Sequence, residues 1–145
     1  MTLKRPDSST NNRPSSPLYF SEVLPNPQGS DTENLNDETV LIETTTDSPI
    51  DLSGYTVTYG NDREYSFPRF LSDITPGTNI TIHSGKGNNS KSSSEPPDYD
   101  LFVGSKRPLL RNTGMQLVLK SPDGDVIDSI QYPELGPREG YYRPE

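Results

Sequence analysis

The segment that decides the fold is MQLVLKSPDGDVIDSIQY, Met115–Tyr132. Apolar and polar residues alternate in its first half, with Leu117 and Leu119 on one face, as in a half-buried β-strand. The Pro122–Gly124 segment suits a type I turn whose Gly takes the positive φ of a bulged hairpin. Val126 then leads the return strand. We therefore predict an antiparallel β-hairpin at this point in the chain.

Similar extended segments precede this hairpin. Val40 and Ile42 share one face of their segment, and Ile80 and Ile82 share one face of theirs, so we expect both pairs to point inward. The Lys86–Pro97 segment is predicted to be a loop, and no strand is predicted after Tyr132. The further predicted strands are Leu18–Leu24, ETVLIETT, YTVTYG (with Tyr55, Val57 and Tyr59 on one face), EYSFP, one that follows a turn within DITPGTNITIHSG, and YDLFVG.

The composition also favours an all-β fold. The 145 residues include no Ala, the best helix former, but 15 Pro and 11 Gly that supply turns at short intervals. A hydrophobic share of 28% allows one thin core, such as that between two small sheets. We predict a polar N-terminal arm at residues 1–17, disordered in isolation, a β-sandwich at 18–132 and an extended tail at 133–145.

Five motifs resemble the lamin tail domain family, archaeal or bacterial in type, in their order and spacing. They are SEVLPNPQGSDTENLNDETV, DLSGYTVTYG, YSFP, ITPGTNITIHSG and SPDGDVIDSIQY. The resemblance implies an immunoglobulin-like β-sandwich that acts as a structural and interaction module rather than an enzyme. Domains of this family bind proteins, sometimes bind DNA, and often accompany enzymes. The chain departs from the family at Tyr55, where Trp is usual, and at Leu109–Gly114, which replaces a Trp-Asn-Asn-like segment.

The net charge is −8, and the predicted arm carries Lys4, Arg5 and Arg13 against Asp7. The acidic remainder shows no basic stripe, so a nucleic acid is not the expected partner, and a DNA or nucleoprotein adaptor is kept as the alternative. An acidic surface that stays hydrated in salt is typical of salt-loving cells. The absence of Cys excludes thiolate chemistry. Without a signal peptide or membrane span, we expect a cytoplasmic protein or a virion component.

The loop Asn26–Val40 is the first candidate for chemistry, because it is rich in acids and Asn. Read from Asp31, it fails the EF-hand template, since Leu35 and Asn36 stand where an oxygen ligand and Gly are needed. A different calcium (Ca2+) geometry, using Asp31, Glu33, Asn36 or Asp37, stays open. A turn held by side-chain bonds to the backbone is the favoured interpretation, and no cofactor is expected.

Catalysis is not predicted. The paired acids lie in or beside polar turns, where their carboxyl groups are hydrated. Acid–base catalysis instead needs carboxyl groups in a partly dry cleft. The single His, His83, is expected to be a hydrogen-bonded structural residue at a strand end, because no motif supplies a nucleophile with it. The acids concerned are Asp98, Asp100, Asp123, Asp125 and Asp128.

Apolar residues outside the predicted inward faces point to an interface with protein. We predict that some of them form a contact surface together with the arm. The function expected is that of a non-enzymatic component repeated in a larger assembly, with self-association or neighbouring subunits as partners. The candidate interface residues are Lys4, Arg5, Arg13, Leu41, Leu109, Leu110, Val118, Tyr141 and Tyr142.

Overall fold

The structure, a computed structural model, describes residues 18–25, 37–45, 48–60, 63–107, 109–111, 113–135 and 140–142. This part of the chain forms β-strands and short 3-10 segments, and contains no α-helix. The elements are β1 (Leu18–Leu24), β2 (Thr39–Thr44), β3 (Thr56–Tyr59), β4 (Arg63–Ser66), η2 (Arg69–Leu71), β5 (Asn79–His83), β6 (Ser90–Lys91), β7 (Asp98–Phe102), β8 (Met115–Lys120), β9 (Val126–Tyr132) and β10 (Tyr141–Tyr142). The prediction of an all-β chain is confirmed.

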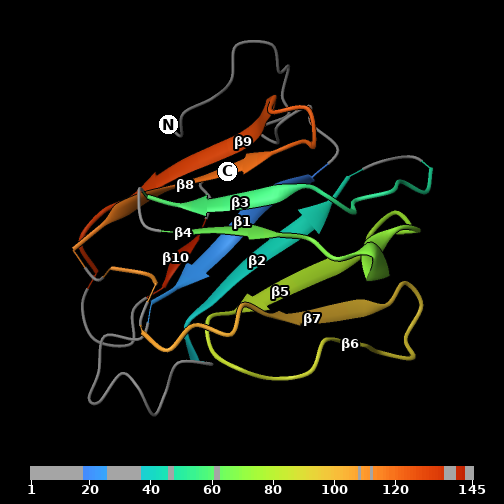
Figure 1. The fold of residues 1–145 in the computed structure, drawn as a ribbon, viewed down its shortest axis with the longest axis horizontal. Helices are drawn as coiled ribbons and strands as arrows, with labels where there is room; N and C mark the ends of the chain where they lie inside the picture. Colours follow the sequence, from blue (N-terminus) through green and yellow to red (C-terminus); the bar gives the residue numbers. More distant parts are fainter. Residues whose placement is uncertain are drawn as a thin grey trace.

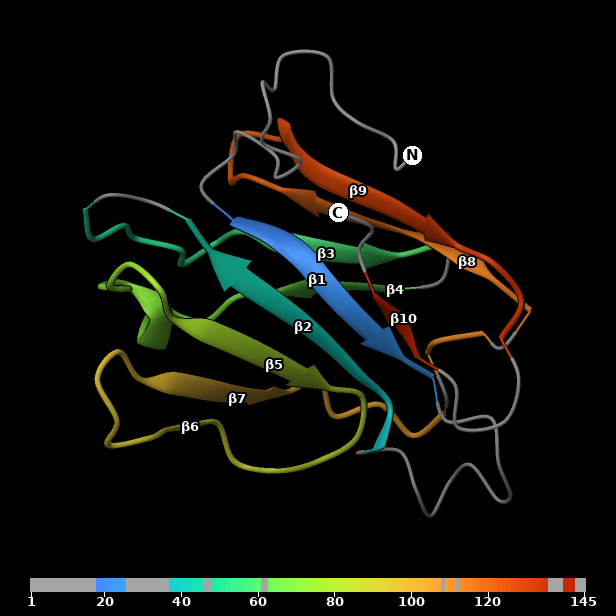
Figure 2. The same cartoon turned by 180° about the vertical axis from the view of Figure 1, so that it is seen from behind.

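The strands form two sheets that pack face to face. One has the order β10-β1-β2-β5-β7-β6 and the other β4-β3-β8-β9. In Figure 1 the four-stranded sheet lies in front of the larger one, and Figure 2 shows the six-stranded sheet from behind. Every pairing is antiparallel except that of β5 with β7, which is parallel. The predicted two-layer sandwich is confirmed.

The β8–β9 hairpin closes as predicted. The Gly124 N–H donates to the Ser121 carbonyl oxygen at 2.9 Å, and Gly124 has φ of 93°. The Ser121 N–H donates to the Asp125 carbonyl oxygen at 2.9 Å, which places the bulge of this turn at Gly124. A second irregularity lies further along β9, where the register shifts between Leu119 and Lys120. Side-chain alternation together with the turn residues was sufficient to predict this element.

The core lies between the two sheets and follows the period-2 pattern of the strands. Val40 and Ile42 in β2, and Ile80 and Ile82 in β5, are all fully buried, as predicted. The larger sheet extends beyond the smaller one, where the segment containing η2 covers it (Figure 1). There the Phe70 ring meets the buried Tyr99 ring edge-on at 5.3 Å.

Two predictions about irregular segments are wrong. The tail expected to lack a strand contains β10, which pairs with β1 at Glu22 and Val23. The loop expected at Lys86–Pro97 contains β6, which pairs with β7. Both are two-residue strands at sheet edges, where backbone pairing needs no apolar alternation and so leaves no sequence pattern.

A side chain of the four-stranded sheet forms a hydrogen bond with the six-stranded sheet at the point where the pairing of β1 is irregular. The register of β1 on β2 shifts between Phe20 and Glu22. The Phe20 N–H donates to the Asp128 carboxylate, in β9 of the opposite sheet, at 2.8 Å. Asp128, which was expected in or beside a polar turn, lies within β9 and links the two sheets.

Candidate functional site

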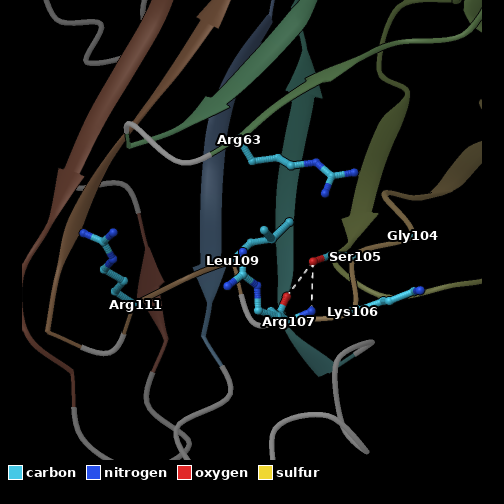
Figure 3. Close-up of a pocket in the computed structure, with 7 residues that line it drawn as sticks. All are labelled: Arg63, Gly104, Ser105, Lys106, Arg107, Leu109 and Arg111. Atoms are coloured by element: carbon cyan, nitrogen blue, oxygen red, sulfur yellow. Dashed lines mark hydrogen bonds between the residues drawn. The ribbon is translucent and has the colours of Figure 1, made fainter.

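A pocket of about 700 Å³ opens at the end of the sandwich where β5 and β7 finish. One wall is the loop between β7 and β8, and Arg63 at the start of β4 reaches over the pocket from the other sheet (Figure 3). Leu109 supplies an apolar surface among polar and charged groups. The lining residues are Arg63, Gly104, Ser105, Lys106, Arg107, Leu109 and Arg111.

The start of the pocket loop is tied to the loop that follows β5. The Gly104 N–H donates to the Gly85 carbonyl oxygen, and the Ser105 N–H to that of Ser84, each at 2.9 Å. The Ser105 hydroxyl then donates to the Arg107 carbonyl oxygen at 2.7 Å and accepts the Arg107 N–H at 3.1 Å (Figure 3). These bonds fix the backbone that carries the neighbouring basic side chains.

The centre of the pocket loop is held by the carboxylate of Glu38, the residue before β2. Glu38 is 1% exposed, and its Oε1 atom accepts the N–H groups of Leu109 at 2.9 Å and Leu110 at 3.2 Å. These bonds hold both leucines in the core, where they are 7% and 3% exposed. The prediction that Leu109 and Leu110 are exposed interface residues is therefore wrong, because a buried acid pulls their loop inward.

Two buried tyrosines, Tyr59 and Tyr132, lie in the core near Glu38. The Tyr132 hydroxyl donates to the Arg111 carbonyl oxygen at 2.8 Å. Burial raises the pKa of Tyr132 well above its usual value, and burial raises the pKa of Tyr59 in the same way, with smaller contributions from Tyr65 and Glu38. Both phenols therefore stay neutral at ordinary pH.

Four of the chain's thirteen Lys and Arg residues line this pocket, which we call the basic pocket: Arg63, Lys106, Arg107 and Arg111. All four side chains are exposed. No carboxylate of the described residues lies within ion-pair distance of Arg63, Lys106 or Arg107. The expected absence of a basic stripe did not anticipate this local group of cations. The signal was GSKRPLLR, Gly104–Arg111, which places three cations close together.

The remaining predicted interface residues do not form one patch. Leu41 in β2 and Val118 in β8 are half-buried, and each lies between inward-facing neighbours, so they are on opposite outer faces of the sandwich. Tyr141 is half-buried with its ring 6.4 Å from that of Tyr132, while Tyr142 pairs through its backbone with β1. Lys4, Arg5 and Arg13 lie outside the described residues.

His83 is a structural residue, as predicted. It ends β5, and its Nε2 atom lies 2.9 Å from Oδ1 of Asp100 in β7. Its ring stacks on that of Phe102 with centroids 4.5 Å apart. Asp98 and Asp100 belong to β7 rather than to a turn, whereas Asp123 and Asp125 are exposed in the β8–β9 turn.

The calcium prediction stays a prediction. Asp31, Glu33 and Asn36 lie outside the described residues, and Asp37 is exposed at their border. Within the part of the chain that the structure describes, no three His, Asp or Glu side chains gather as they would around a metal ion. A helix long and apolar enough to cross a membrane is likewise not found in that part.

The two sheets and the site that they carry define a structural domain of the immunoglobulin-like β-sandwich class. A comparison with protein families matches the lamin tail domain over residues 11–134, so the chain belongs to the lamin tail domain family. Domains of this family are structural and of a protein-interaction type. No curated protein matches the chain.

Proposed function

We propose that this protein is a non-enzymatic structural and protein-interaction module that is repeated within a larger assembly. The observation that carries the proposal is the family match over residues 11–134, since the family is structural and interactive. The N-terminal arm and the C-terminal tail are the segments that contact neighbouring copies. A chain of this size gains contact area when its ends reach beyond its own sandwich.

The way in which polar groups are used supports a non-catalytic role. His83 is engaged by Asp100 and Phe102, and Asp128 binds the backbone of the opposite sheet. Glu38 is buried and bound to the pocket loop. Each of these groups serves the architecture, whereas catalysis needs groups that meet at a substrate.

The assembly that we propose is the surface layer or particle of a salt-loving organism or its virus. The net charge of −8 supports this setting, because a strongly acidic surface remains hydrated in concentrated salt. Leu41 and Val118, on opposite outer faces, supply apolar contacts to two different neighbours.

Cross-linking tests this function. The full chain is mixed with a copy labelled with nitrogen-15, and amine cross-links between light and heavy copies are identified by mass spectrometry. We expect Lys4 to join different copies. A variant that begins at residue 18 should keep its melting temperature but lose these links. Links confined to single copies would contradict the assembly role.

A further inference from the structure

The basic pocket has three properties that together indicate a ligand. It is a recess of about 700 Å³, its loop is fixed by internal hydrogen bonds, and its exposed cations stand on a chain of net charge −8. Arg63, Lys106 and Arg107 have no carboxylate partner among the described residues. Exposed cations around one recess produce a local positive potential, which favours an incoming anion.

The backbone of the pocket loop argues against a single small oxyanion. Such anions usually bind in a nest of free N–H groups, which supplies several short hydrogen bonds at one point. Here six N–H groups of the loop already have partners within the domain. The residues whose N–H groups are engaged are Gly104, Ser105, Arg107, Leu109, Leu110 and Arg111. Recognition is therefore left to the side-chain cations.

The arrangement of these cations favours an extended ligand. The side chains of Lys106 and Arg111 point to opposite sides of the pocket, and Arg63 approaches from the other sheet (Figure 3). Three of the four cations are guanidinium groups, which bind carboxylates through two parallel hydrogen bonds. Several anionic groups spaced along a chain would each meet a different cation.

We propose that the basic pocket binds a short acidic segment, rich in Asp and Glu, of a partner protein. This deepens the interaction role proposed above by naming the chemistry of the partner. A short segment fits a site with four cations, whereas a long nucleic acid would extend from the pocket onto an acidic body. Because hydrogen bonds already hold the pocket loop in place, binding of such a segment costs little conformational entropy of the protein.

Fluorescence anisotropy of the full chain with a labelled oligoglutamate peptide tests this proposal. We expect binding at low salt that is lost at high salt, and no binding of the matching oligoglutamine peptide. Arg107→Gln should weaken binding about two- to fivefold, and Arg63→Gln combined with Lys106→Gln and Arg107→Gln by more than about tenfold.

The matched control is Arg69→Gln, which removes one exposed cation in η2, at the end of the sandwich where β5 starts. It should bind the peptide as the wild type does. Equal losses of peptide affinity in Arg69→Gln and Arg107→Gln would overturn the proposal, because they would show that only the net charge of the protein matters. Melting temperatures of all variants should match the wild type, since the altered side chains are exposed.

Three further outcomes would overturn the proposal. The first is no binding of oligoglutamate by the wild type. The second is tighter binding of single-stranded DNA through the same residues, which would make the ligand a nucleic acid. The third is displacement of the labelled peptide by inorganic phosphate at concentrations as low as those at which the unlabelled peptide displaces it. If the chain self-assembles but does not bind the peptide, only the pocket proposal is refuted. If the chain binds the peptide but stays a monomer, only the assembly role is refuted.

Discussion

Glu38 connects the strand that it precedes with the loop that forms the basic pocket. Its carboxylate lies in the core at 1% exposure and accepts two backbone N–H groups. A buried acid is tolerated only when its oxygen atoms are used in this way. The acidic residue before β2, which in the sequence belongs to a polar run, is therefore a structural element of the site.

Glu38→Ala should destabilise the protein by about 2–4 kcal/mol, because it leaves the N–H groups of Leu109 and Leu110 buried without an acceptor. Urea unfolding measures the loss, and hydrogen exchange should show faster exchange of these two amides. The control Glu64→Ala, at an exposed position in β4, should change stability by less than about 0.5 kcal/mol. Equal effects of the two substitutions would contradict the role of Glu38.

Glu22 makes stability depend on pH. Partial burial raises its pKa above the ordinary 4.5, and the nearby Glu43 raises it further. The folded protein therefore holds this proton more tightly than the unfolded chain does. The stability that the proton contributes is complete below pH 4.5 and is lost as the pH rises through the raised pKa.

Glu22→Gln should raise stability at neutral pH by roughly 0.5 kcal/mol, a small gain because solvent screens this carboxylate. At a pH below 4.5 it should change stability little, since the wild-type side chain is then protonated. Thermal unfolding at both pH values checks this. Glu64→Gln makes the same change in net charge, and an equal gain from it would show that Glu22 has no specific effect.

At the scale of elements, the pocket loop ends in a backbone conformation that requires Gly. Gly114 has φ of 107°, and a Cβ atom there would lie 2.8 Å from the Tyr132 carbonyl oxygen. Gly104, at the start of the same loop, has φ of 82° with nothing near the Cβ position. Substitution at Gly104 therefore tests the cost of positive φ alone, whereas substitution at Gly114 tests positive φ together with a steric contact.

Gly114→Ala should cost about 3 kcal/mol, because strain at positive φ adds to a backbone contact that cannot relax. Gly104→Ala should cost only about 1–2 kcal/mol, from positive φ alone. Urea unfolding of the two variants gives the comparison. A larger loss from Gly104→Ala would contradict the contact between Gly114 and the β9 backbone.

The elements that the sequence could predict are those whose side chains alternate or whose turns have specific residues. The β8–β9 hairpin, with Leu117, Leu119 and Gly124, is of this kind. The elements that it could not predict depend on distant partners. β6 and β10 exist through backbone pairing at sheet edges, and the inward position of Leu109 depends on Glu38, far away in the chain. The basic pocket was missed because Arg63 joins its other cations only in the folded sandwich.

At the scale of the whole molecule, the charges are unevenly distributed. A chain of net charge −8 gathers four cations around one recess at one end of its sandwich. Such a molecule presents surfaces of opposite sign, which orient partners as they approach. In the proposed assembly, its two outer faces and its basic pocket would contact partners in different directions.

The native mass of the full chain, measured by light scattering over a range of protein concentrations, tests the assembly role most directly. The proposed module should reach a mass that is a multiple of the 16.1 kDa chain as the concentration rises. A mass that stays at 16.1 kDa at every concentration and salt condition would contradict it.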